Sequence, residues 1–214
     1  MKFDCAIDEE FARGLAAAQG AITEGKLVVV PTDTVYGVAA DAFSPTAVQR
    51  LLDAKGRTRQ MPPPVLVGAP TTLEALAVDV PRYVLDMVSA LWPGPLTVIC
   101  KQQPSLNWDL GETRNTVAVR MPNNSHVLAL LKTTGPLAVS SANATGESAA
   151  RDVEGAERML GEKVAVYLDG GPTQSGLAST IIDVTGVAPR VLRSGAIDLA
   201  TLREFNNAFE GVAN

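Results

Sequence analysis

The sequence predicts one α/β domain built on a mixed β-sheet. Its 214 residues fit one medium-sized domain, and 46% of them are hydrophobic against 19% charged, so the chain can bury enough apolar surface to offset the entropy of ordering it. Helix-like and strand-like segments interleave without a strict βαβ order, which favours a mixed sheet over a doubly wound parallel one. No repeat, low-complexity tract or linker interrupts the chain. We therefore expect a single domain over residues 1–214.

Helices are expected where apolar side chains recur every three or four residues. The first such pattern, over residues 9–24, consists of Phe11, Leu15, Ala18 and Ile22. Gly25 follows it at a position that favours a C-terminal cap. Ser44 and Pro45 supply the N-cap and first residue of a second helix, which runs to 55. Further helices are predicted at 81–91, 125–131, 152–160 and after Asp198.

Strands are expected where short, β-branched apolar runs end in turn residues. The run 27–30 (LVVV) has the pattern of a strand buried on both faces. The remaining predicted strands are, in chain order, 65–67, 96–100, 116–120, 137–139, 164–168, 180–184 and 190–193.

Charge and cysteine content exclude several classes of protein. A net charge of −5 excludes a molecule that attracts polyanions over its whole surface. Cys5 and Cys100 have neither metal-ligand nor CxxC spacing, which favours a reducing compartment. The acidic N-terminal segment does not resemble a signal peptide, and no apolar run approaches the roughly 20 residues that span a bilayer. We expect a cytoplasmic protein that is not a membrane protein, and a monomer or weak dimer.

Common catalytic motifs are absent from the sequence. Neither the GxxxxGK[ST] phosphate loop nor a GxGxxG after a strand occurs. His126 is the one histidine, so sites with two histidine ligands are excluded and a Ser-His-Asp triad has a single candidate. Because His126 lies beside a predicted helix start, we expect a solvated or capping role for it.

Three polar clusters lie next to apolar segments, where open α/β sheets bind their ligands. Residues 31–37 (PTDTVYG) could hold a small zwitterion, with an ordinary Asx/ST turn as the equal alternative. Residues 55–59 (KGRTR) carry three cations suited to phosphate. In the alternative interpretation, one or two of them only interact favourably with the dipole at the C-terminus of the preceding helix. Residues 136–146 (PLAVSSANATG) bring hydroxyl and amide groups to a strand end, with a polar loop as the alternative.

Other strand ends would complete a basic, hydroxyl-rich pocket if they converge with these clusters. They carry Arg120, the pair Ser179 and Thr180, and Arg193. The glycine-containing loop 170–176 (GGPTQSG) is either a mobile lid over such a pocket or a flexible surface connection.

Seven collinear segments resemble the YrdC-like family of threonylcarbamoyl-AMP synthases over nearly the whole chain. They are 31–37 (PTDTVYG), 55–57 (KGR), 91–97 (LWPGPLT), 116–122 (TVAVRMP), 136–143 (PLAVSSAN), 179–184 (STIIDV) and 192–195 (LRSG). The resemblance implies a twisted, mostly parallel or mixed sheet with a large concave, positively charged cavity. It implies a reaction of L-threonine, bicarbonate or carbon dioxide, and ATP, for threonylcarbamoyladenosine formation in tRNA. A tRNA-modifying threonylcarbamoyl transferase would act downstream.

The resemblance also assigns residues. Thr34 and Arg120 match threonine-binding positions, with Ser179 nearby. The matching ATP-binding positions are Lys55, Arg57, Thr116, Ser141, Asn143 and Arg193. Lys55 and Arg57 are the expected catalytic residues, because they would offset charge on the triphosphate. Magnesium is expected to enter with the nucleotide and not in a dedicated protein site.

The sequence departs from the family pattern after residue 57. The stretch 58–64 (TRQMPPP) replaces the usual proline and short polar segment, and Leu66 stands where some members have a polar threonine contact. The longer members' extra C-terminal domain is not expected here. Two alternatives remain: a non-catalytic module that binds double-stranded RNA in a basic cavity, and a paralogue that handles carbamoyl groups or hydrolyses the adenylate.

Overall fold

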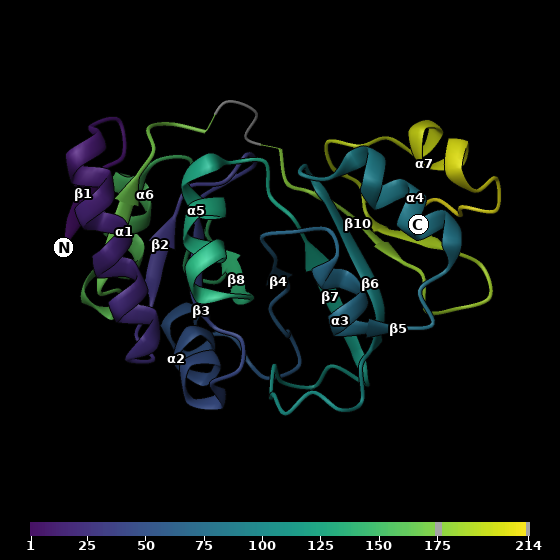
Figure 1. Ribbon diagram of the computed structural model, residues 1–214, viewed down its shortest axis with the longest axis horizontal. Coiled ribbons are helices and arrows are strands. Elements are labelled where there is room, and N and C mark those ends of the chain that lie inside the picture. The colour runs from purple at the N-terminus through teal and green to yellow at the C-terminus, as the bar shows by residue number, and fades with distance from the viewer. Residues whose placement is uncertain (174–176, 213–214) are drawn as a thin grey trace.

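The computed structural model describes residues 1–173 and 177–212, and its strands join in one twisted sheet (Figure 1). The sheet order is β1-β9-β2-β3-β8-β4-β7-β6-β10-β11, with β5 paired to β6. In chain order the strands are β1 (Lys2–Asp4), β2 (Val28–Val30), β3 (Gly37–Asp41), β4 (Val65–Leu66), β5 (Ala77–Val78), β6 (Leu96–Gln102), β7 (Thr116–Arg120), β8 (Leu137–Ser141), β9 (Val166–Asp169), β10 (Thr180–Asp183) and β11 (Arg190–Arg193).

This sheet contains both parallel and antiparallel strand pairs. The pairs β1·β9, β9·β2, β4·β7 and β6·β10 are parallel, whereas β2·β3, β3·β8, β8·β4, β6·β7, β5·β6 and β10·β11 are antiparallel. The predicted mixed sheet is therefore confirmed. The two-residue strand β4 pairs with β8 on one side and with β7 on the other, so it connects the β3·β8 side of the sheet to the β7·β6·β10 side.

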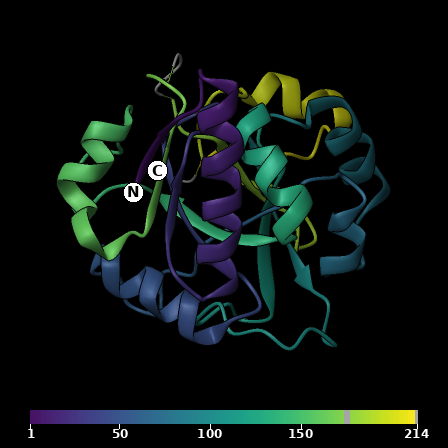
Figure 2. The same ribbon diagram turned by 60° about the vertical axis from the view of Figure 1, so that its left-hand side comes forward.

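Helices cover both faces of the sheet. They are α1 (Asp8–Thr23), α2 (Pro45–Lys55), α3 (Thr72–Leu76), α4 (Arg82–Leu91), α5 (Ser125–Thr134), α6 (Val153–Leu160) and α7 (Leu199–Phe205). In β2, Val28 and Val30 pack with α1 and α5, while Val29 packs with α2 and α6 on the opposite face. Figure 2 shows α1 and α5 side by side on their face. A third apolar cluster joins α3, α4 and α7 to β6, β7 and β10.

Capping residues fix the helix ends as the sequence predicts. The Ser44 hydroxyl accepts a hydrogen bond from the Ala47 backbone N–H at 3.3 Å, and Gly56 ends the same helix with φ of 66°. Asp152 and Asp198 cap α6 and α7 in the same way. Among the described helices, none is long and apolar enough to cross a membrane.

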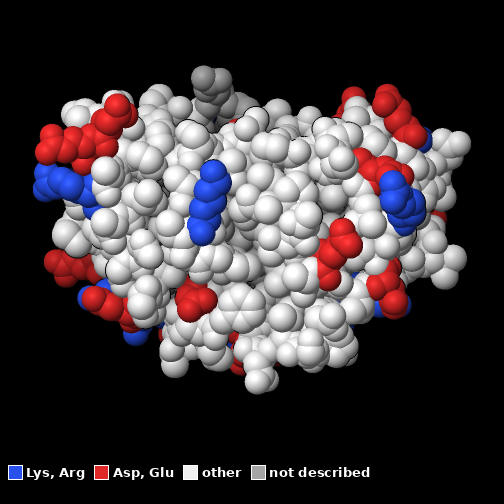
Figure 3. Space-filling view, in the orientation of Figure 1, with Lys and Arg blue, Asp and Glu red and all other residues white. Residues whose placement is uncertain are grey.

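Five short elements were not predicted: β1, β3, α3, β5 and a 3₁₀ helix, η1 (Gly161–Lys163). The β3 sequence, GVAAD, is rich in glycine and alanine, which have weak strand propensity, so the sheet pairs on both sides decide its conformation. All predicted helices and strands are present with ends shifted by up to three residues. On the face seen in Figure 3, charged side chains gather mainly toward its two ends.

Candidate functional site

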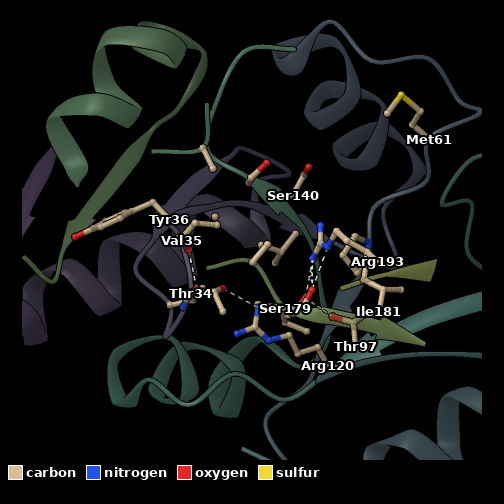
Figure 4. A pocket seen from close by; sticks show the side chains of 18 of the residues that line it. Thr34, Val35, Tyr36, Met61, Thr97, Arg120, Ser140, Ser179, Ile181 and Arg193 are labelled. Atoms are coloured by element: carbon tan, nitrogen blue, oxygen red, sulfur yellow. Dashed lines mark hydrogen bonds between the residues drawn. The ribbon is translucent and has the colours of Figure 1, made fainter. Parts of the chain in front are cut away.

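A cavity of about 460 Å³ opens where the strand ends meet. Its wall takes residues from the turn after β2, the loop before β4, and the strands β4, β6, β7, β8, β10 and β11. The labelled side chains Thr34, Thr97, Arg120, Ser179 and Arg193 point into one shared space (Figure 4). The convergence that the sequence left open is thus present in the fold.

Arg120, at the end of β7, forms the buried floor of this cavity. Its Nε donates to the Gly94 carbonyl at 3.1 Å, its Nη1 to the Thr34 hydroxyl at 2.9 Å, and its Nη2 to the Asp33 carboxylate at 2.6 Å. Burial lowers the pKa of Arg120, and the positive charge of Arg193 also lowers it. The Asp33 carboxylate acts in the opposite direction and raises the pKa of Arg120. The guanidinium is therefore held in one orientation by two segments of the chain, the turn that contains Asp33 and Thr34 and the loop at Gly94.

The turn after β2 supplies the hydroxyls beside Arg120. The Thr32 Oγ1 accepts from the Thr34 backbone N–H at 3.1 Å and lies 3.1 Å from the Thr34 Oγ1. This is the ST-turn expected as the alternative to a binding role, and the same two residues line the cavity. Thr32 and Thr34 therefore both form the turn and face the cavity.

A second hydroxyl cluster faces the first across the cavity. The Ser179 and Thr97 hydroxyls lie 2.8 Å apart, and both residues are buried. Arg193 donates from Nη2 to the Ser179 Oγ at 2.9 Å and from Nε to the Ser179 carbonyl at 3.0 Å. The rest of Arg193 is exposed at the mouth. This arrangement holds the guanidinium at the cavity edge.

Arg57 enters the cavity from the loop after α2. Its Nη1 donates to the Ser140 Oγ at 2.9 Å, and its Nε is buried with no hydrogen-bond partner among the described residues. Burial lowers the pKa of Arg57. A buried donor without an acceptor costs free energy, which fits a ligand oxygen at this position.

Lys55 lies behind the cavity wall. Its ammonium donates to the backbone carbonyls of Ser141 and Asn143 and to the Asn143 Oδ1, the last two at 2.7 and 3.1 Å. Burial, together with the smaller effect of the nearby Arg57 charge, lowers the pKa of Lys55 to about 7. The side chain is not part of the cavity lining.

The three cations of the 55–59 cluster therefore point in three directions. Lys55 faces the 141–143 loop, Arg57 faces the cavity, and Arg59 forms an exposed ion pair with Asp109 at 2.6 Å. The expectation that these three cations together suit phosphate is corrected, because the left-handed Gly56 turns the chain between Lys55 and Arg57.

The other predicted site residues occupy distinct places. Ser141 lines the cavity, whereas Asn143 sits behind it and donates from Nδ2 to the Glu147 carbonyl at 2.7 Å. Thr116 lines a neighbouring apolar hollow of about 180 Å³. This hollow shares Thr97 and Ile181 with the main cavity. The two spaces therefore share part of their walls.

Sequence reasoning did not select Thr97 or Ser140 as site residues. Both lay inside segments that were already recognised, 91–97 and 136–143. Thr97 is the second residue of the predicted strand 96–100, and Ser140 directly follows the predicted strand 137–139. A polar residue near the first or last position of an apolar strand is the signal that could have found them. The unusual 58–64 loop also lines the cavity, through Met61, Pro62 and Pro64.

The expected roles of the 170–176 loop and of His126 have different outcomes. Residues 174–176 lie outside the described residues, and the Tyr36 hydroxyl anchors the described part by donating to the Gly171 carbonyl at 2.7 Å. His126 neither caps α5 nor is fully solvated. Asn124 caps that helix, and the half-buried His126 ring packs edge-on against Phe11 at 4.8 Å.

Metal-ligating side chains do not gather in the described residues. No group of three or more His, Cys, Asp or Glu side chains is placed to hold a metal ion there.

Comparisons with known proteins identify the family. The sequence model of the Sua5/YciO/YrdC family, described as telomere recombination, matches residues 20–195. A Mycobacterium leprae protein provisionally named threonylcarbamoyl-AMP synthase is 51% identical over 202 residues, which are 94% of this chain and 92% of that protein. The threonylcarbamoyl-AMP synthase of Pyrococcus abyssi is 35% identical over 188 residues, and the match covers 87% of this chain and 55% of that protein.

Solved structures agree with this match. P. abyssi Sua5 in complex with L-threonine superposes with a TM-score of 0.90 at 31% identity, over 99% of this chain and 62% of that one. E. coli YciO shares the fold, with a TM-score of 0.79 at 23% identity over 93% of this chain and 95% of that one. On the family match and the 51% identity, this chain belongs to the Sua5/YciO/YrdC family.

Proposed function

We propose that this protein is an L-threonylcarbamoyladenylate synthase, which joins L-threonine, bicarbonate or carbon dioxide, and ATP and releases pyrophosphate. The observation that carries the proposal is the convergence of Arg57, Arg120 and Arg193 on one hydroxyl-lined cavity in a protein of net charge −5. Such a cavity concentrates positive charge where anionic substrates would bind. Relatives named threonylcarbamoyl-AMP synthase support the same reading.

The floor of the cavity suits the threonine carboxylate. A guanidinium has five N–H donors, and the three described hydrogen bonds of Arg120 leave one on each terminal nitrogen. Two such donors can bind a carboxylate. Thr34 and Ser179 provide hydroxyls on either side, and the L-threonine complex of P. abyssi Sua5 fits this assignment.

The opposite part of the cavity suits the nucleotide. Arg57 offers its unpaired Nε, Arg193 stands at the mouth, and Ser140 and Ser141 add hydroxyls. The apolar hollow that contains Thr116 gives room for part of the nucleotide beside the triphosphate. Magnesium would enter bound to ATP and neutralise phosphate charge.

The chemistry needs positioning more than a strong base. The threonine amine must lose its proton to capture carbon dioxide, and a carbamate oxygen then attacks the α-phosphorus in line as pyrophosphate leaves. The cations at the cavity edge would stabilise charge on the leaving group. The product is a mixed anhydride. A threonylcarbamoyl transferase would then transfer its threonylcarbamoyl group to tRNA in the cytoplasm and release AMP.

The direct test is pyrophosphate release from ATP and magnesium, with and without L-threonine or bicarbonate, combined with mass detection of the nucleotide product. We expect release to require both co-substrates and to yield the threonylcarbamoyl-adenylate mass. Nucleotide turnover that ignores threonine would instead indicate a paralogue. RNA binding with steep salt dependence and no turnover would indicate the non-catalytic module.

A further inference from the structure

Lys55 is among the largest fully buried side chains of the described protein, at 2% exposure. It is the last residue of α2, and its ammonium has three acceptors: the Ser141 carbonyl, the Asn143 carbonyl and the Asn143 Oδ1. An ammonium has three N–H donors and no acceptor, so these bonds use its full capacity. Lys55 therefore has no donor left for a molecule in the cavity.

The backbone of Lys55 holds the same loop from a second point. Its carbonyl accepts a hydrogen bond from the Thr145 backbone N–H at 3.0 Å. The loop 141–145 is thus fastened to the end of α2 through both the side chain and the main chain of one residue. On the other side, the Ala142 N–H donates to the Tyr36 carbonyl at 2.7 Å.

The 141–145 loop that Lys55 holds directly follows Ser140 in the cavity wall and begins with Ser141. Ser140 and Ser141 line the cavity, and the Ser140 hydroxyl accepts from Arg57 at 2.9 Å. The Ser141 carbonyl points to Lys55 while the residue itself faces the cavity. A shift of this loop would move both serines and the partner of Arg57 together.

We propose that Lys55 is a positioning residue, which sets the 141–145 loop and through it the nucleotide contacts of Ser140, Ser141 and Arg57. This proposal rests on the proposed function in assuming that the ligand of those three residues is ATP. It differs from a direct phosphate contact by Lys55, in which the ammonium would reach into the cavity.

The test compares Lys55→Met, which removes charge and donors, with Lys55→Gln, which removes charge but keeps two donors. Lys132→Gln, on the exposed face of α5, is the control for loss of one positive charge. Hydrogen–deuterium exchange of residues 140–147 is measured without nucleotide, and ATP affinity is measured by calorimetry. We expect Lys55→Met to speed exchange and to weaken ATP binding, each about tenfold, because charge-assisted hydrogen bonds are lost. Lys55→Gln should lie between it and wild type.

If Lys55→Gln restores slow exchange of the loop and ATP affinity relative to Lys55→Met, the hydrogen-bond donors of residue 55, and not its charge, position the loop. Loop exchange at the wild-type rate together with weaker ATP binding in both variants would overturn the proposal and assign Lys55 to the phosphates. If Lys55→Met does not fold, Lys55→Gln carries the comparison alone. Failure of wild-type protein to bind ATP would contradict the proposed function, while the exchange measurement would still decide the role of Lys55.

Discussion

The Asp33 carboxylate accepts a hydrogen bond from Arg120 Nη2 at 2.6 Å, with 15% and 9% of the two side chains exposed. The two residues are 87 positions apart in the chain. Asp33 also accepts from the Asn123 backbone N–H at 3.0 Å, so one carboxylate joins the turn after β2 to the segment after β7. This pair fixes the arginine that we assign to the threonine carboxylate.

We expect Asp33→Asn to raise the KM for threonine by about ten- to a hundredfold, because the orientation of Arg120 loses its charged partner. The KM for ATP should change much less, since Arg57 and Arg193 do not depend on this pair. Steady-state pyrophosphate release with each substrate varied in turn checks the difference. Equal increases in both KM values would contradict the assignment of Arg120 to threonine.

Gly37 tests the packing of the sheet beside the cavity. A Cβ added there would lie 2.6 Å from the Val139 Cγ1 in the neighbouring strand. We expect Gly37→Ala to lower the free energy of unfolding by about 1–3 kcal/mol through overpacking. The control is Gly20→Ala within α1, where a Cβ has no neighbour within 4 Å and helix propensity should raise stability by up to about 1 kcal/mol. Urea unfolding of both variants measures the two effects.

Cys5 and Cys100 are predicted to be unreactive in the folded protein. Both are buried, and burial raises the pKa of each thiol to about 12 from an ordinary 9.0. At pH 8 the thiolate fraction should therefore be about a thousandfold lower than for an exposed cysteine. Labelling with a maleimide or a disulfide reagent should follow unfolding in urea. Rapid labelling in buffer would contradict the burial of these residues.

The hydrogen bond between Thr97 and Ser179 predicts that substitutions of the two residues have non-additive effects on the free energy of unfolding. In Ser179→Ala the buried Thr97 hydroxyl loses the partner it has at 2.8 Å, which should cost about 1–3 kcal/mol of stability. Thr97→Val alone should leave the Ser179 hydroxyl with its bond from Arg193 and so cost less. The double variant should then be more stable than the sum of the single changes predicts. Urea unfolding of all four proteins completes the cycle, and strict additivity would show that the two hydroxyls do not interact.

The local chemistry of the sequence determined most of the secondary structure. Apolar periodicity placed the helix of residues 8–23, and Ser44 with Gly56 placed the ends of the helix between them. These features act through neighbouring residues, so they can be read without knowledge of the fold. The strand 37–41 has no such local signal, and its two neighbouring strands decide it.

The sequence by itself determined the mixed α/β class and, by its seven family segments, which stretches carry the site. Only the tertiary structure decided that Arg57 faces the cavity while Lys55, two residues earlier, turns behind it. It also brought Thr34 to Arg120 and Thr97 to Ser179 across more than 80 positions of the chain. Hydrogen bonds between such distant residues depend on strand order and register, and a single sequence does not encode these contacts in any local pattern.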